Sequence, residues 1–435
     1  MLIGRLDPAL HQESGAIHAV FQANAHPTSA SSEERLRATA LGAYLVMRLL
    51  DRTLELAGTT DEALHLQRVS TARFVDELPT TVAECAHLRL ILAALTADSD
   101  GPAWPHLRSA LLRYAGWLER EGRLDLSLEA LRLTARTWRG EIPPQDFTTL
   151  ALNVGRVNRQ LARLRLAEDA YDVAAEAAET TGDRVGQLRA RLGAISVRRL
   201  RGEVTGLEAE LRAVLAECES EAALTTLLPL VHADIGALCT SVGRAGDAIR
   251  AMVRAARAAA SLPERLQVLA GLGRTLLEVG YRDTAKLVLE HVASHAADRL
   301  VRATADLELM DVASAEGNRL AFERLRSSLG RYMWRLPATA RADFHYRSGL
   351  GLSRFAQPGR ASSSWSAGRA LALEEGLDDW AGVFLRLEKS LPGSGEVTVE
   401  RDAPASLNLG ALLDEVHALI HPASWSTMQA GARPS

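Results

Sequence analysis

Apolar side chains recur every three or four residues along most of the chain, which is the spacing of one face of an α-helix. A stripe of this kind after residue 31 comprises Leu36, Ala40, Tyr44, Met47 and Leu50. No stretch shows the sustained alternation expected of a half-buried strand. The pattern predicts helices of about 15–18 residues separated by very short turns. Because short turns force successive helices to run antiparallel, we expect stacked helix hairpins.

Helix-breaking residues and changes in composition divide the chain into segments. Breaks are predicted at Gly122, Pro143, Gly182, Gly202, Gly243, Pro263, Gly280, Gly317, Pro337 and Pro358. Thr81 and Glu84 have the spacing of a capping box, which predicts a helix start there. We expect the following segments: an N-terminal tail with a short helix (1–30), an N-terminal helical cap (31–101), a repeat array (102–391), a linker rich in Gly, Pro and Ser (392–406), and a C-terminal amphipathic helix with a disordered tail (407–435).

The C-terminal helix carries one apolar stripe, made of Leu409, Leu412, Leu413, Val416, Leu419 and Ile420. Such a stripe is costly in water, and a repeat array needs its last apolar face covered. We therefore expect the helix to fold back on the end of the array or on its groove, or to dock on a partner.

Composition agrees with a helical fold. Ala and Leu account for 143 of the 435 residues, whereas 20 residues are aromatic, and this usage favours helices over strands. The net charge is −4, which argues against a general nucleic-acid-binding surface. Arginine supplies 48 of the 50 basic side chains, and its planar fork can bind carboxylate or phosphate through two hydrogen bonds.

Cysteine usage and hydropathy bear on the compartment. The three cysteines are too few and too scattered for a disulfide framework, so we expect them to be small buried residues. The first residues lack the charged start and long apolar run of a signal peptide. Charged residues such as Arg48 and Arg89 interrupt each apolar run before it reaches about 18 residues. These observations predict a cytoplasmic, prokaryotic protein without a membrane span.

A pattern of small and large residues repeats along the chain. One copy has Gly236, Gly243, Ala248, Met252 and Ala255 at offsets of 0, 7, 12, 16 and 19. The same offsets occur in a copy 37 residues later and in one upstream, which comprise Gly273, Gly280, Ala285, Leu289 and Val292, and Gly155, Ala162, Ala167, Tyr171 and Ala174. Small residues at the first and third marks let two helices approach closely, glycine at the second turns the chain, and the large residue at the fourth fills space.

This pattern resembles the tetratricopeptide repeat. The similarity is good for 148–181, 229–262 and 266–299, weaker for 108–139, 302–334 and 345–377, and shifted in register for 184–218. The period is 36–38 residues instead of the family's 34, and it is similar to that of the arms of bacterial signalling regulators. The resemblance implies an all-α, right-handed solenoid of about eight antiparallel helix hairpins.

Residues with catalytic or metal-binding spacing are few. With only two lysines, Lys286 and Lys389, the chain has no phosphate-binding loop, and neither a nucleophile elbow nor a zinc-protease motif occurs. Two histidine pairs have i, i+4 spacing, His291 with His295 and His417 with His421, but neither has a clear third ligand. We expect no catalytic residue, metal or cofactor, and no enzymatic activity.

Arginines concentrate on the expected first helices of the hairpins. No acid occurs in 147–166 or in 184–202, whereas the helix between these stretches is acidic. In the tetratricopeptide family the first helix of each hairpin lines the concave groove. The resemblance makes these residues candidates for partner binding: Arg113, Asn153, Arg156, Arg159, Gln160, Arg191, Arg198, Gln267 and Arg274. Such a groove favours an acidic or phosphorylated segment. Alternatively, the basic and acidic helices neutralise each other across the hairpin.

Two functions follow from this reasoning. The first is a non-catalytic protein–protein interaction scaffold or adaptor, which holds a segment of a partner protein, acidic in character, in the groove. The second is a signalling or regulatory sensor that responds to a peptide or small molecule and acts through a partner protein. No DNA-binding helix-turn-helix is evident in the sequence.

Overall fold

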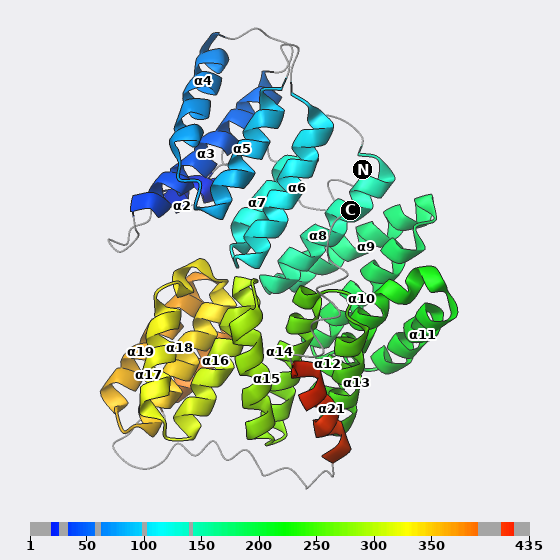
Figure 1. Ribbon diagram of the computed structural model, residues 1–435, viewed down its shortest axis with the longest axis vertical. Helices are drawn as coiled ribbons and strands as arrows, with labels where there is room; N and C mark the ends of the chain where they lie inside the picture. Colours follow the sequence, from blue (N-terminus) through cyan, green and yellow to red (C-terminus); the bar gives the residue numbers. More distant parts are fainter. Residues whose placement is uncertain are drawn as a thin grey trace. The chain divides into compact units, whose positions relative to one another are not determined.

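The computed structural model describes residues 19–25, 34–56, 62–97, 102–138, 142–389 and 410–421. Every regular element in these ranges is a helix, and no strand occurs among them (Figure 1). The predicted all-helical fold class is therefore confirmed, and consecutive helices pack against one another as a helical repeat. The predicted linker 392–406 and the tail after residue 421 lie outside the described residues.

The chain forms two compact units. The first comprises residues 1–119 and 123–193, and the second comprises residues 120–122 and 194–435. The boundary falls within α10 (Arg184–Leu200), inside the span predicted as one array. The helices before α10 are α2 (Ala19–Ala25), α3 (Glu34–Glu55), α4 (Glu62–Glu77), α5 (Ala83–Leu95), α6 (Trp104–Arg120), α7 (Leu124–Arg136), α8 (Pro144–Gln160) and α9 (Leu164–Thr181).

The second unit continues the series of hairpins. Its helices are α11 (Leu207–Ser220), the 3-10 helix η2 (Ala222–Leu227), α12 (Leu228–Ser241), α13 (Ala245–Ala258), α14 (Leu262–Glu278), α15 (Arg282–His295), α16 (Arg299–Ala315), α17 (Arg319–Gly330), η3 (Met333–Arg335), α18 (Ala338–Arg354), α19 (Pro358–Glu374), α20 (Asp378–Lys389) and α21 (Gly410–Ile420). Two clusters of buried apolar side chains lie in the described part of this unit, one made by α13–α16 with α21 and one made by α16–α20.

The repeat marks identified in the sequence meet inside each hairpin. A Cβ atom added to Gly155 on α8 would lie 2.8 Å from the ring of Tyr171 on α9. The corresponding distances are 2.7 Å from Gly236 to Met252 and 2.6 Å from Gly273 to Leu289. The first-mark glycine therefore leaves the space that the fourth-mark side chain, 16 residues later, occupies.

The second mark turns the chain between the two helices. Gly243 has a φ of +75° and Gly280 a φ of +88°, and glycine adopts this left-handed conformation without a steric penalty. Ala162 stands at the same mark in the earlier copy and takes a φ of +60°, although such a conformation is unfavourable for a residue with a Cβ atom. The hairpin turn thus has one backbone geometry whichever residue occupies it.

The capping box predicted at Thr81 is wrong. Helix α5 begins at Ala83 after Val82, which makes no side-chain cap. Glu84 is buried instead, and its carboxylate accepts hydrogen bonds of 2.7 Å from the Tyr114 hydroxyl and 2.7 Å from Arg123 Nη1. Two strong donors offset the cost of burying the charge, so tertiary contacts prevail over the local cap.

The C-terminal helix α21 packs on the array, but on neither of the two array faces expected from the sequence, the end and the groove. It contacts α13 and α15, and Val416 and Leu419 join their apolar cluster. Both contacted helices are the second helices of their hairpins. Helix α21 therefore covers neither the last helix of the array nor the first-helix face.

One segment of the described chain, Ala222–Ser241, is long and apolar enough to cross a membrane by length and composition, with a mean hydropathy of 1.5. Charged residues were expected to interrupt every apolar run before about 18 residues, and this segment is an exception. In the structure the segment forms η2 and α12, which pack against α11 and α13. In the structure 39% of this apolar window is buried.

Replacing Ala285 by Leu is expected to lower the free energy of unfolding by about 1–3 kcal/mol, because the extra methyl groups must enter a packed crossing. Ala285 has no exposed surface. Thermal and urea melts of Ala285→Leu check this expectation. Ala258→Leu is the control, since Ala258 is the exposed last residue of α13. Equal melts for the two variants would contradict the assigned register.

Candidate binding surface on the first helices

All nine residues predicted to bind a partner lie on first helices of hairpins. Arg113 is on α6, the next four are on α8, Arg191 and Arg198 are on α10, and Gln267 and Arg274 are on α14. Residues up to Arg191 belong to the first unit and the others to the second. The candidates therefore form two sets, one in each unit.

In the first unit, four side chains form the Glu119 cluster, defined by Glu119, Asn153, Arg156 and Gln160. Arg156 donates from Nε and Nη2 to the two carboxylate oxygens of Glu119, at 2.7 and 2.8 Å. Its Nη2 also lies 2.9 Å from Asn153 Oδ1, and Gln160 Nε2 donates to Glu119 Oε1 at 2.6 Å. The structure thus brings three predicted residues together around an acid that sequence reasoning missed.

This pairing neutralises the most prominent predicted arginine. Burial opposes the charged form of Arg156, but the hydrogen bonds and the charge of Glu119 outweigh it and raise the pKa of Arg156. The Arg156 side chain stays 45% exposed and Glu119 14%. A partner carboxylate that reached Arg156 would have to compete with Glu119.

The other predicted arginines differ in their surroundings. Arg198 makes a two-pronged ion pair with Glu210 on α11, at 3.0 and 2.5 Å, so it is neutralised across the hairpin as the alternative interpretation expected. Within the described ranges, Arg113 and Arg159 form no hydrogen bond or ion pair, and Arg159 Nε is buried. Arg113 and Arg159 are therefore the guanidinium groups best placed to receive an external acid.

The charge contrast between neighbouring helices is large. Helices α8 and α10 together carry seven arginines and one acid, whereas α9 carries one arginine and five acids. Tyr171 of α9 packs against both α8 and α10, at Gly155 and Gly193. The packing of α9 between two basic helices compensates part of their charge, and the remainder stays on the first helices.

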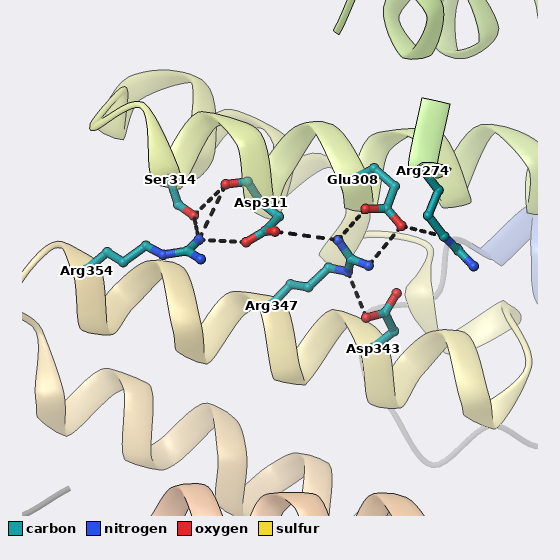
Figure 2. A network of polar contacts seen from close by, with 7 residues as sticks. All are labelled: Arg274, Glu308, Asp311, Ser314, Asp343, Arg347 and Arg354. Atoms are coloured by element: carbon teal, nitrogen blue, oxygen red, sulfur yellow. Dashed lines mark hydrogen bonds and ion pairs between the residues drawn. The ribbon is translucent and has the colours of Figure 1, made fainter. Parts of the chain in front are cut away.

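In the second unit, first helices α14, α16 and α18 share the Arg347 network (Figure 2). Its members are Arg274, Glu308, Asp311, Ser314, Asp343, Arg347 and Arg354. Arg347 donates to both oxygens of Glu308 at 2.7 and 2.9 Å and to Asp343 at 2.7 Å. Arg274 binds the same Glu308 from the other side at 2.8 Å. A predicted groove arginine is again paired with an acid of the neighbouring first helix.

The network continues along α16 to a second arginine. Asp311 lies 3.9 Å from Arg347 and accepts from Arg354 Nη1 at 2.6 Å, and the same Nη1 reaches Ser314 Oγ at 2.5 Å. The three arginines and three acids of the network together carry no net charge. In contrast to the first unit, these helices offer an ordered polar surface without excess charge.

Burial controls protonation at the centre of this network. Desolvation raises the pKa of Asp343, although Arg347 opposes the rise. Burial also opposes the charge of Arg347, but Asp343 and Glu308 outweigh it, so the pKa of Arg347 lies above its ordinary value. Arg347 is therefore permanently charged and forms ion pairs with Glu308, Asp311 and Asp343.

The missed acids follow a rule that the sequence contains. The pairs Arg156–Glu119, Arg163–Asp125, Arg274–Glu308 and Arg347–Glu308 are separated by 37, 38, 34 and 39 residues. These separations are about one repeat, so equivalent positions of successive hairpins face each other. Opposite charges spaced about one repeat apart are the sequence signal that could have identified Glu119 and Glu308.

No group of three or more His, Cys, Asp or Glu side chains suited to a metal occurs within the described ranges. The rings of His291 and His295 stack at 4.3 Å, and burial together with His295 lowers the pKa of His291 to about 4. Cys85, Cys218 and Cys239 are buried free thiols, which confirms the expectation for them.

Comparisons with known proteins add the following findings. No protein-family model matches the chain, and no curated protein matches it in sequence. Among solved structures, the chain is similar to a Rap protein in a crystal structure of that protein complexed with competence and sporulation factor. The identity is 9%, the TM-score is 0.47, and the alignment covers 78% of this chain and 99% of that chain.

Proposed function

We propose that the chain is a non-catalytic, tetratricopeptide-like scaffold or adaptor of the bacterial cytoplasm that binds a segment of a partner protein along its first helices. The observation that carries the proposal is the charge contrast among α8, α9 and α10, where basic first helices flank the acidic α9. A row of guanidinium groups on successive helices suits an extended chain that carries carboxylates.

The structure also supports a division of roles along this surface. Arg113 and Arg159 are the anchors for an incoming acid, because they lack an internal partner among the described residues. The Glu119 cluster orders α6 against α8 and presents the side-chain amides of Asn153 and Gln160 beside them. Amides of this kind can bind a peptide backbone.

Reversing the charge of both anchors is expected to abolish the binding of acidic segments. An array of immobilised peptides that differ in acidic content, probed with the parent chain at low and high salt, provides the measurement. We expect the parent to select acidic peptides and to lose them at high salt, since exposed charges are screened beyond about 10 Å at 0.1 M. Arg113→Glu with Arg159→Glu should bind none of these peptides while keeping its helical content.

The matched control is Arg319→Glu with Arg324→Glu on α17, a second helix of the other unit, which should leave the selection unchanged. Reversal at Arg156 is avoided, because a glutamate there would face Glu119 and disturb the fold. If the Arg113/Arg159 variant selects the same peptides as the parent, the arginines serve intramolecular neutralisation alone.

A sensor that responds to a peptide or small molecule is the second candidate. The observation that favours it is a cavity of about 270 Å³ among α11, α12 and α13, close to the lower end of ligand-pocket volumes. Ligand binding to one folded state raises the melting temperature. A thermal-shift screen of the Arg113→Glu/Arg159→Glu variant with small carboxylates and short peptides separates the candidates, because without those two anchors only a ligand of the α11–α13 cavity gives a shift.

A further inference from the structure

The position of α21 is not explained by capping of the repeat array. Helix α21 lies against α13 and α15 in the second unit (Figure 1). A cap would cover the exposed apolar face at the end of the array. Helix α20, and not α21, follows the last hairpin there. The docking of α21 therefore marks a surface on the second helices with its own recognition properties.

Helix α21 fills this surface incompletely. Val416 and Leu419 are buried, whereas Leu412, Leu413 and Ile420 remain partly exposed. A cavity of about 410 Å³, open to solvent on one side, remains between α13 and the N-terminal half of α21. The surface can thus accommodate a larger or differently substituted helix than α21.

The charges on the surface favour an acidic occupant. Arg250, Arg254 and Arg257 follow one another along α13 and line this cavity. From α21, Glu415 lies 3.2 Å from Arg257 Nη2. Arg250 binds Asp247 of its own helix at 2.7 Å, while Arg254 has neither hydrogen bond nor ion pair among the described residues. An occupant with an additional acid opposite Arg254 would complete the pairing.

The surface also extends beyond α21. Arg250 and Arg254 line the cavity of about 270 Å³ between α11, α12 and α13 as well. Its apolar lining includes Leu211, Leu215 and Leu238. An amphipathic segment longer than α21 could place apolar side chains there and acids on the arginines.

We propose that the α13–α15 face is a docking site for an acidic amphipathic helix of a partner protein, and that α21 occupies it as a tethered competitor. Residues 390–409 join α20 to α21, and a tether keeps its segment at a high effective concentration near the site. A partner helix displaces α21 when its additional ion pairs with α13 outweigh the high effective concentration of the tethered helix. This surface is separate from the first-helix surface and does not depend on the function proposed for it.

A fluorescent peptide with the sequence of residues 407–421 tests the proposal on the full-length chain. In the released variant, Val416→Asp with Leu419→Asp removes the two buried anchors of α21. We expect this variant to bind the peptide at least about tenfold more tightly than the parent, because the tethered competitor is gone. The matched control is His417→Asp with Ala418→Asp, at exposed positions of α21, which should bind as weakly as the parent.

Charge recognition is tested in the same titration with two altered peptides. Ala411 borders the cavity beside Arg250 and Arg254, so a peptide with Ala411→Glu should bind the released variant more tightly than the native peptide. Arg254→Ala, added to the released variant, should remove that gain. Glu415→Arg in the peptide should weaken binding, and Arg257→Glu in the released variant should restore it.

Three results would overturn the proposal. The first is equal peptide affinity for the parent and the released variant. The second is a released variant that keeps the helical content and melting behaviour of the parent but binds no peptide. The third is a released variant that no longer unfolds cooperatively, which would make α21 an integral part of the fold.

Discussion

Replacing Arg347 by Met is expected to lower the free energy of unfolding of the second unit by about 3–5 kcal/mol, the usual cost of removing one partner of a buried ion pair. Arg347 is 14% exposed and Glu308 5%. Methionine retains much of the apolar stem but leaves Glu308 with Arg274 alone and Asp343 without its arginine. Urea melts followed by circular dichroism measure the loss.

The deficit of Arg347→Met should depend on pH. Burial already raises the pKa of Asp343 in the parent, and removal of the cation raises it further. A carboxyl group whose pKa is higher in the folded state than in the unfolded state destabilises the fold at high pH, and this effect disappears as pH falls below both values. The deficit should therefore shrink between pH 7.5 and 4.5.

Arg274→Met is the control for the network. Arg274 is about half-exposed, and its partner Glu308 keeps Arg347, so we expect a loss of at most about 1 kcal/mol. If both variants lose the same stability, or if the deficit of Arg347→Met is independent of pH, the buried ion pairs of Arg347 are not the source of the network's stabilisation.

Replacing Trp365 by Ala is expected to cost about 3–5 kcal/mol, the range for deleting a buried aromatic side chain. Trp365 is completely buried on α19. A Cβ atom at Gly349 on α18 would lie 2.1 Å from its indole, and Nε1 donates to the Tyr346 carbonyl at 3.2 Å. The variant loses this packing and leaves a cavity where the two helices cross. Thermal melts measure the loss.

The comparison with Trp334→Ala isolates the effect of burial. Trp334 is 46% exposed, and its ring lies under the guanidinium of Arg335. Because most of its surface is already in water, this variant should lose about 1 kcal/mol or less. Similar losses at both positions would show that the packing of Trp365 against Gly349 does not stabilise the hairpin.

The contacts within a hairpin could be predicted from the sequence alone. Gly155 and Tyr171, or Gly273 and Leu289, are 16 residues apart, and a helix, a tight turn and a second helix bring these positions together. The turn at Gly243 follows from the same reasoning, because its left-handed φ is one that glycine adopts readily. These contacts depend on helical periodicity and turn geometry, which are local properties.

The partners of the charged residues were decided by the tertiary structure. For Arg156 the sequence left open partner binding or neutralisation across its own hairpin, but the stacking of one hairpin on the next places Glu119 of the preceding hairpin against it. Glu84 was interpreted as a helix cap, yet Tyr114 and Arg123 bind it in the interior. Periodicity does not determine how far one hairpin is shifted and rotated against the next, and that offset selects the pairs.

The position of α21 likewise came from the tertiary structure. Its apolar stripe, centred on Val416, made burial necessary, because exposed apolar side chains are costly in water. The same stripe fits any apolar face of the array, so the sequence left the end, the groove and a partner open. The structure places α21 on α13 and α15, where Val416 and Leu419 complete an apolar cluster and Glu415 pairs with Arg257. The hydrophobic effect is non-directional and required only that the apolar stripe of α21 be covered. The shape and charge of the contact determined which face of the array covers it.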